Sequence, residues 1–252
     1  MDERRSSLAG SIAKRSRIKD PNSDTVRQSG QAAALVMEKE MVAVFGPSPA
    51  LDVLDFGAAA GRVTLPLARL FSRSRLTATD VDAECVEYFK MVAPRNCEAH
   101  TNEYYPPLPL LSASFDCVIA ISVWSHFPDE LAIRWLAEMQ RVCRPDALLL
   151  ISTAGLATFE TWRTSAPRWA NVPLQRYYDD QYIYLEFKGI GSAAGRWPGI
   201  EGVGSWGDTV MHPDYIRRRW SAFFDIVEIR ERGMPGNQDL VIMRNRGNAS
   251  AR

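Results

Sequence analysis

The stretch LDVLDFGAAAGRVTLPLARL, residues 51–70, joins an apolar run to an acidic residue, a loop of small residues and an amphipathic segment. This order predicts a buried strand, a tight turn and a helix. Dinucleotide-binding turns carry three glycines, which let the backbone approach a pyrophosphate. Here only Gly57 and Gly61 remain, with three alanines between them. The Cβ of Ala59 would crowd a phosphate and Asp55 would repel one, so the loop favours a ligand with a cationic amino group and no phosphate.

The chain beyond this stretch alternates between short apolar runs and longer amphipathic segments. Helices are predicted at 23–45, 61–71, 82–93, 129–143 and just after His212, and buried strands at 51–56, 75–79, 116–122 and 147–152. Strands and helices in alternation predict a parallel α/β sheet with right-handed crossovers. The segments FFDIVEIRE and NQDLVIMR, joined by RGMPG, predict a final hairpin.

Length and composition limit the classes of protein. A chain of 252 residues with 46% hydrophobic residues can bury one sizeable core. Lysine and arginine together number 30, as do aspartate and glutamate, so no basic excess favours nucleic acid as a partner. The cysteines form no C-x-x-C pair and the histidines are scattered, which disfavours a metal site and a disulfide framework. No apolar run reaches the roughly 20 residues of a membrane span. We therefore expect a reduced, cytoplasmic protein, and the oligomeric state stays open.

Composition also divides the chain into segments. Residues 1–22 are polar and lack a clear period, which predicts a flexible N-terminal segment. Residues 23–246 are predicted to form one domain. Within it, residues 155–212 are rich in Trp, Tyr, Gly and Pro without a sustained period, and we expect an irregular cap that binds substrate over the carboxyl edge of the sheet. Tryptophans concentrate here and shortly beyond, where they either stack on a substrate or hold the cap together: Trp162, Trp169, Trp197, Trp206 and Trp220.

A second acidic residue follows the next predicted strand, in the sequence RLTATDVD. Asp80 lies about 20 residues beyond the glycine turn, where an acid can accept hydrogen bonds from both ribose hydroxyls. Asp82 is the better candidate for capping the helix at 82–93, because it directly precedes the amphipathic segment. This leaves Asp80 available for a ligand.

Five motifs in this order resemble those of class I S-adenosylmethionine-dependent methyltransferases of the small-molecule type, with a methyltransferase type 11/25-like domain. They are VLDFGAAAGRVTLPLA, ATDVD, EYYPPLPLLSASFDCVIAISVWSHFPDE, WLAEMQRVCRPDALLLIST and NQDLVIMR, and the resemblance covers roughly residues 30 to 245. It implies a Rossmann-like, mostly parallel sheet with a terminal antiparallel strand, with the cap between the fifth strand and the final hairpin. It also implies S-adenosylmethionine as cofactor and S-adenosylhomocysteine as product.

The resemblance implies a role for each matching residue. Asp55 would contact the methionine amino group through water, Asp80 would hold the ribose, and Val81 would pack on the adenine face. Asn102 and Glu103 are alternatives for the adenine amino group, and either could be a solvated loop residue. The expected cofactor contacts are Asp55, Gly57, Ala58, Ala59, Gly61, Asp80, Val81, Asn102, Glu103 and Ile121. Ala59 replaces the family's usual glycine, which is tolerable if its φ angle stays negative.

His126, in AISVWSHFPDE after the fourth strand, is the candidate general base for a hydroxyl acceptor, because the histidine pKa suits proton transfer near neutrality. The alternative is that its ring buttresses the helix at 129–143. Substrate contacts are expected from Trp124, Tyr182 and Trp206. The favoured function is O-methylation of a sugar, glycoside or natural-product hydroxyl. A catalytically inactive S-adenosylmethionine-binding module and, less favoured, a nicotinamide-dependent oxidoreductase are the alternatives.

Overall fold

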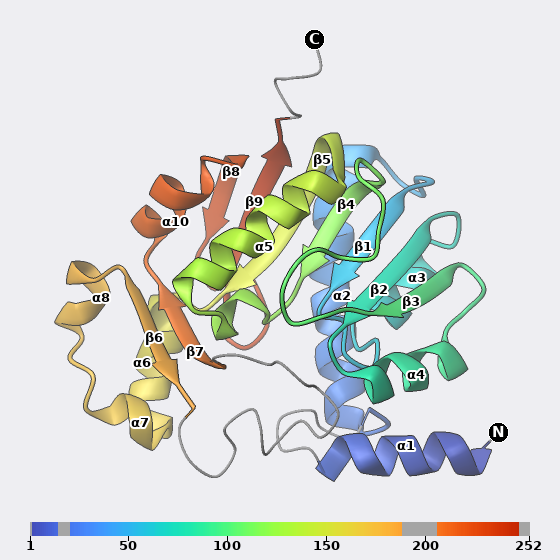
Figure 1. The fold of residues 1–252 in the computed structure, drawn as a ribbon, viewed down its shortest axis with the longest axis horizontal. Helices are drawn as coiled ribbons and strands as arrows, with labels where there is room; N and C mark the ends of the chain where they lie inside the picture. The colour runs from blue at the N-terminus through green and yellow to red at the C-terminus, as the bar shows by residue number, and fades with distance from the viewer. Residues whose placement is uncertain (1, 15–20, 188–205, 247–252) are drawn as a thin grey trace.

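A mixed sheet of seven strands forms the centre of the computed structural model, which describes residues 2–14, 21–187 and 206–246 (Figure 1). The strands lie in the order β3-β2-β1-β4-β5-β9-β8. Their bounds are β1 (Asp52–Phe56), β2 (Arg75–Asp80), β3 (Cys97–Thr101), β4 (Phe115–Ala120), β5 (Cys143–Thr153), β8 (Phe224–Arg230) and β9 (Asp239–Asn245). The first five are parallel, whereas β9 runs antiparallel to both β5 and β8.

This arrangement confirms the predicted fold class, a Rossmann-like sheet with a reversed terminal strand. The reversed strand is not at the edge, however. The final hairpin folds back so that β9 inserts between β5 and β8, and β8 becomes the outer strand.

Helices cover both faces of the sheet, and some of them begin at a side chain that caps the first turn. They are α2 (Asp24–Phe45), α3 (Thr64–Leu70), α4 (Ala83–Val92), α5 (Asp129–Val142) and α10 (Pro213–Trp220). Ser23 caps α2 by accepting a hydrogen bond from the backbone N–H of Val26, and Asp82 caps α4. Helix α3 begins at Thr64, later than the predicted residue 61, because positive φ angles in the preceding loop exclude helical geometry.

Alternating side chains of the central strands supply the two cores. Leu54 and Phe56 of β1 face the layer that contains α5, whereas Val53 faces the layer of α2 and α3. In Figure 1, α5 crosses in front of the sheet and α2 runs behind it. Burial on both faces explains why β1, β4 and β5 appear in the sequence as continuous apolar runs.

The N-terminal segment differs from its prediction, because residues 2–14 form helix α1 (Asp2–Lys14). Ala9 and Ile12 are buried against Cys85 and Tyr88 of α4. The hydroxyl of Ser11 also donates a hydrogen bond to Glu84 Oε2, at 2.7 Å. The apolar face of α1 consists of so few residues that the sequence shows no period there.

The cap also has more regular structure than predicted. Residues 155–187 and 206–212 contain α6 (Leu156–Ser165), α7 (Pro167–Ala170), α8 (Gln175–Asp179), β6 (Tyr182–Glu186) and β7 (Gly207–Met211). Strands β6 and β7 pair as an antiparallel ribbon, and the cap has its own small core around Phe159 and Trp169. These elements are too short to give a sustained period, which is why the segment looked irregular. Trp197 lies outside the described residues.

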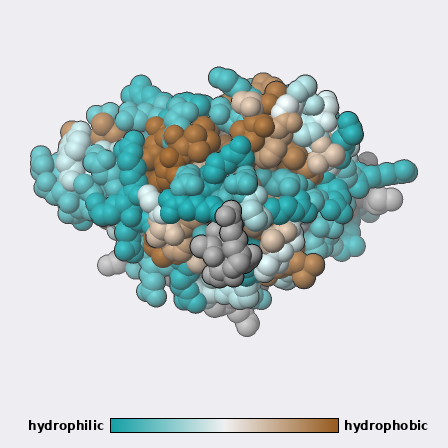
Figure 2. Space-filling view, turned by 90° about the horizontal axis from the view of Figure 1, so that it is seen from above, coloured by the Kyte–Doolittle hydropathy of each residue, from teal (hydrophilic) through white to brown (hydrophobic). Residues whose placement is uncertain are grey.

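The surface seen in Figure 2 is mostly hydrophilic, and its hydrophobic areas are separated from one another. Among the described residues, no helix is long and apolar enough to cross a membrane.

Candidate functional site

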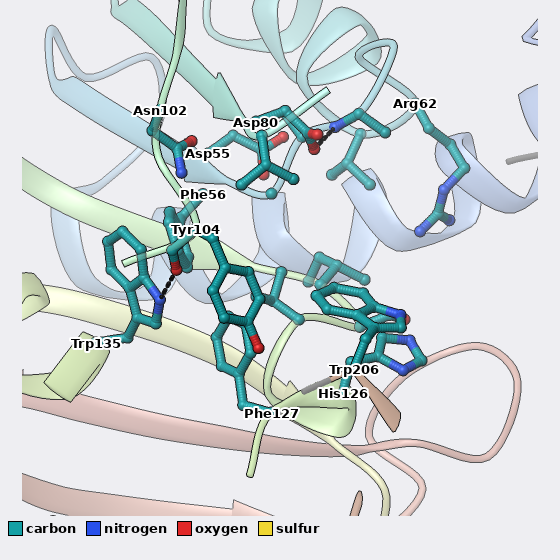
Figure 3. A pocket seen from close by; sticks show the side chains of 18 residues that line it. Asp55, Phe56, Arg62, Asp80, Asn102, Tyr104, His126, Phe127, Trp135 and Trp206 are labelled. Carbon is teal, nitrogen blue, oxygen red and sulfur yellow. Dashed lines mark hydrogen bonds between the residues drawn. The ribbon is translucent and has the colours of Figure 1, made fainter. Parts of the chain in front are cut away.

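A cavity of about 240 Å³ opens at the carboxyl ends of β1, β2 and β4, where the predicted loop lies (Figure 3). One side carries polar groups and the other carries aromatic rings. In Figure 3, Asn102 lies at one end of the polar side, Asp55 and Asp80 lie in the middle, and Arg62 lies at the other end. The cavity therefore has an elongated polar wall opposite an aromatic one.

The loop after β1 is held against β2 by its own backbone. The N–H groups of Gly57 and Ala58 both donate to the carbonyl of Thr79, at 2.8 and 3.0 Å. Gly57 has a φ angle of +75°, and a Cβ there would lie 2.4 Å from Val123 Cγ2. Only glycine fits at this position, because both the backbone angle and the available space exclude a side chain.

Ala59 contradicts the expectation of a negative φ angle. Its φ is +49°, in the left-handed region that favours glycine. Its N–H donates a hydrogen bond of 2.7 Å to Asp80 Oδ2, which holds the strained residue in place. A glycine at this position would adopt this backbone angle without strain.

Asp80 therefore has a structural role in addition to the predicted one. Its Oδ2 accepts the Ala59 N–H, and its Oδ1 accepts the N–H of Asp82 at 2.9 Å. Burial raises the pKa of Asp80 to about 6, although these backbone hydrogen bonds oppose the shift. A carboxylate offers about four acceptor positions, so two remain for hydroxyl groups of a ligand.

Asp55 is buried beneath the loop at the end of β1. Its Oδ2 accepts a hydrogen bond of 2.5 Å from the hydroxyl of Thr64, the first residue of α3. Burial raises the pKa of Asp55 to about 6, while the Thr64 hydrogen bond and the positive charge of Arg62 act to lower it. The ligand-free site thus contains two desolvated carboxylates, which favour a cationic ligand.

Arg62 is a cavity residue that the sequence prediction missed. Within the described part of the chain, its guanidinium has no hydrogen bond or ion pair, and burial lowers its pKa. The backbone and stem of Arg62 pass directly over Gly30 of α2, where a Cβ would lie 2.1 Å from the Arg62 carbonyl oxygen and 2.7 Å from its Cγ. Its position immediately after Gly61 was the only signal in the sequence.

The structure distinguishes the two candidates that follow β3. Asn102 is buried and lines the cavity, whereas Glu103 is exposed and does not line it. The side-chain amide of Asn102 donates to the carbonyl of Glu103 at 2.7 Å, and its Oδ1 is buried with no hydrogen-bond partner among the described residues. An orphaned acceptor beside a cavity fits a ligand that brings an N–H donor.

The other predicted cofactor residues are divided between two cavities. Ala58, Val81 and Ile121 line the same cavity as Asp80. Gly61 instead lines a neighbouring cavity bounded by α2, α3 and α4. A Cβ at Gly61 would lie 2.3 Å from Phe89 Cδ2, so this glycine serves the close packing of the loop on α4.

Aromatic side chains form the second wall of the cavity. They are Phe56, Tyr104, Phe127, Trp135 and Trp206, of which only Trp206 was predicted. The indole N–H of Trp135 donates to the carbonyl of Tyr104 at 3.2 Å, and the rings of Phe56 and Trp135 lie 4.5 Å apart. The missed rings come from β1, the segment after β3, the residue after the 3-10 helix Trp124–His126, and α5, so the fold is needed to bring them together.

Two of the predicted substrate residues lie elsewhere. Trp124 is fully buried, and its indole N–H donates to the carbonyl of Ala132 in α5, so it belongs to the core and does not line the cavity. Tyr182 of β6 donates its hydroxyl to the carbonyl of Phe127 at 2.8 Å and also lies outside the cavity wall. Both rings join the cap and the β4–α5 segment to the main core.

His126 lines the cavity from the short 3-10 helix Trp124–His126 after β4. Its ring does not buttress α5. Instead its Nδ1 lies 2.8 Å from the carbonyl oxygen of Gly207 in β7, and the ring stacks on Trp206 with centroids 5.2 Å apart. Neither His100 in β3 nor His212, which caps α10, lines the cavity.

The sheet order, the reversed strand and the cavity at the carboxyl edge together define the class I methyltransferase fold. Residues 53–146 match a family model described as a methyltransferase domain, which spans β1 through the first residues of β5. The resemblance indicated by the sequence motifs is thus confirmed. No curated protein sequence matches the chain.

Solved structures share this fold at low sequence identity. The PH0226 protein from Pyrococcus horikoshii OT3 is 15% identical with a TM-score of 0.62, covering 90% of this chain and 93% of its own. A 1,6-didemethyltoxoflavin-N1-methyltransferase from Burkholderia thailandensis, solved with 1,6-didemethyltoxoflavin and S-adenosylhomocysteine, is 17% identical with a TM-score of 0.58, covering 96% and 86%. A methyltransferase from Methanosarcina mazei is 16% identical with a TM-score of 0.55, covering 82% and 97%. These likenesses show that the chain has the class I methyltransferase fold.

Proposed function

We propose that this chain is an S-adenosylmethionine-dependent methyltransferase that methylates a hydroxyl group of a small ring-shaped molecule. The single observation that carries the proposal is the two-sided cavity, with ligand-binding polar groups along one wall and aromatic rings with His126 along the other. The match to the methyltransferase-domain family supports the reaction class.

The polar wall fits the cofactor along its length. Asn102 would accept the adenine amino group through its orphaned Oδ1, and Val81 would pack on the adenine. Asp80, next along the wall, would accept the ribose hydroxyls. The methionine part would lie between Asp55 and Arg62, because its ammonium suits the carboxylate and its carboxylate suits the unpaired guanidinium.

The aromatic wall supports a ring-shaped acceptor. Flat apolar faces stack on sugar rings and on planar natural-product scaffolds. The acceptor class is therefore a sugar, a glycoside or another natural product with a hydroxyl, and Trp206 is the cap residue expected to contact it.

When bound, the cofactor supplies an already activated methyl group, so placing the acceptor in line provides much of the rate enhancement. His126 would remove the proton of the acceptor hydroxyl. It is the only histidine in the described part of the chain that lines the cavity, and imidazole is the side chain that most often acts as a general base.

Two measurements test the proposal. Calorimetry should show that S-adenosylhomocysteine binds and that NAD does not, since binding of NAD alone would instead support an oxidoreductase. Transfer of a radiolabelled methyl group should then be screened against sugars, glycosides and phenolic natural products, with His126→Gln as the matched variant. Cofactor binding without transfer to any acceptor class would contradict the enzymatic role and favour a binding module. Equal transfer rates for the wild type and His126→Gln would contradict the base.

A further inference from the structure

The hydrogen bond of His126 fixes which ring nitrogen carries the proton. Its Nδ1 lies 2.8 Å from the carbonyl oxygen of Gly207. A carbonyl oxygen can only accept a hydrogen bond, so Nδ1 must be the donor. In the neutral ring this leaves Nε2 as the nitrogen with a free electron pair, which is the state that a general base requires.

A carboxylate of the cap stands beside the same nitrogen. Asp208 Oδ1 lies 3.5 Å from His126 Nδ1, and the Asp208 side chain is only 6% exposed. The other oxygen, Oδ2, binds Arg168 of α7 at 2.5 Å and the indole N–H of Trp169 at 3.2 Å. Oδ1 is thus the Asp208 oxygen that lies beside His126, where a negative charge stabilises a protonated ring.

The strand that carries these groups is closely fitted to its neighbour. Gly207 and Asp208 pair with Glu186 and Leu185 of β6. A Cβ at Gly207 would lie 2.4 Å from the carbonyl oxygen of Leu185, so only glycine allows this approach. Residues 206–208 thus supply a stacking ring, a hydrogen-bond acceptor and a carboxylate to one histidine.

We propose that Asp208 is a positioning residue, which acts with the Gly207 carbonyl to hold His126 in its Nδ1–H form and to stabilise the ring once it is protonated. The proposal deepens the proposed function and rests on His126 as its base. The proton would leave the acceptor hydroxyl for Nε2 as the acceptor oxygen bonds to the methyl carbon, and the electron pair of the broken carbon–sulfur bond would stay on sulfur. The cap would then complete the catalytic site as well as cover it.

Charged groups reach the His126 site from several elements. Asp208 of β7 is nearest, and Arg168 of α7 lies behind it and offsets part of its charge. The cavity also contains Asp55, Asp80 and Arg62, on the polar wall.

The test is nitrogen NMR of the full chain labelled with ¹⁵N-histidine, which needs no acceptor. The chain has three histidines, and the signals lost in His126→Gln identify that ring. The expected result is the Nδ1–H tautomer in the neutral wild type, and in Asp208→Asn a larger population of the Nε2–H tautomer, because the negative charge beside Nδ1 is lost. Asp214→Asn is the matched control, because Asp214 lies 3.6 Å from His212 Nδ1 and should affect that ring alone.

An Nε2–H tautomer in the wild type would overturn the proposal, even if Asp208→Asn does not fold. An unchanged tautomer population of His126 in a folded Asp208→Asn variant would also overturn it. Failure of the proposed function is distinguishable from both, because it shows as absent S-adenosylhomocysteine binding or as unchanged methyl transfer in His126→Gln.

Discussion

Replacing Arg62 by methionine should weaken the binding of S-adenosylhomocysteine without weakening that of 5′-methylthioadenosine. 5′-Methylthioadenosine keeps adenine, ribose and sulfur but lacks the amino-acid part, so it has no carboxylate to pair with the Arg62 guanidinium. Methionine preserves the unbranched stem that passes over Gly30 of α2. The change therefore removes the charge while leaving the packing largely intact.

The size of the effect follows from the surroundings of the guanidinium. Among the described residues it has no hydrogen bond or ion pair, so a bound carboxylate would not have to displace a protein partner. A hydrogen bond to a charged group contributes about 1.5–3 kcal/mol, which corresponds to a loss of roughly 10- to 150-fold in affinity. The charge of Arg62 also lowers the pKa of Asp55, so that pKa should rise further in the variant.

Isothermal titration calorimetry of both ligands with both proteins is the assay. Arg69→Met is the control, since Arg69 is an exposed arginine on the nearby helix α3 and does not line this cavity. An equal loss of affinity for both ligands in Arg62→Met would show that Arg62 shapes the cavity. Unchanged affinity for S-adenosylhomocysteine would place the methionine carboxylate elsewhere.

Three further predictions concern the polar wall and its loop. Asp80→Ala should lower S-adenosylhomocysteine affinity by at least about 30-fold, because the ribose hydroxyls lose their hydrogen-bond acceptor. Calorimetry on a variant shown to be folded measures this affinity, and an unchanged value would contradict the ribose role of Asp80. Ala59→Gly should raise the free energy of unfolding, measured in urea, by up to about 1 kcal/mol, because relief of the left-handed strain exceeds the entropy cost of glycine. A clear loss of stability, or weaker cofactor binding at unchanged stability, would show that alanine is fitted to this loop. Cofactor affinity should fall about tenfold or more between about pH 7.5 and about pH 5, since Asp55 and Asp80, with pKa values of about 6, become protonated and no longer attract the ammonium. An affinity that does not change across this pH range would exclude such a contact.

The sequence was sufficient to predict the sheet and the polar wall where a local pattern carries the information. Strands β1 and β2 each have an acidic residue at or next to their carboxyl end, and parallel strands bring these ends to one edge, so Asp55 and Asp80 could be placed together. Their hydrogen-bond partners were not predictable in the same way. That Asp80 holds the loop depends on the positive φ angle of Ala59, which its residue type disfavours.

The aromatic wall shows why the remainder of the site could not be predicted from the sequence. Trp124 and Trp135 are both fully buried next to Phe56, yet only Trp135 borders the cavity. The difference depends on how the 3-10 helix that carries Trp124 and the helix α5 that carries Trp135 pack on the sheet. The amino-acid composition contains no information about that packing. His126 was found from its position after β4, but its partners come from residues 206–208, which the sequence gives no reason to bring near it.

The buried carboxylates link cofactor binding to the stability of the fold. Asp55 and Asp80 have pKa values of about 6 in the ligand-free site, above the ordinary value of 3.8, because burial disfavours their charged forms. The folded chain therefore binds these protons more tightly than the unfolded chain, and its stability falls as the pH rises from about 4 to about 6. At neutral pH the site contains two desolvated negative charges, on Asp55 and Asp80, and an alanine, Ala59, with a left-handed backbone φ angle. A ligand that brings an ammonium and two hydroxyl donors to these groups offsets the desolvation cost. The features that lower the stability of the fold on their own therefore also favour a ligand with an ammonium group over a dinucleotide.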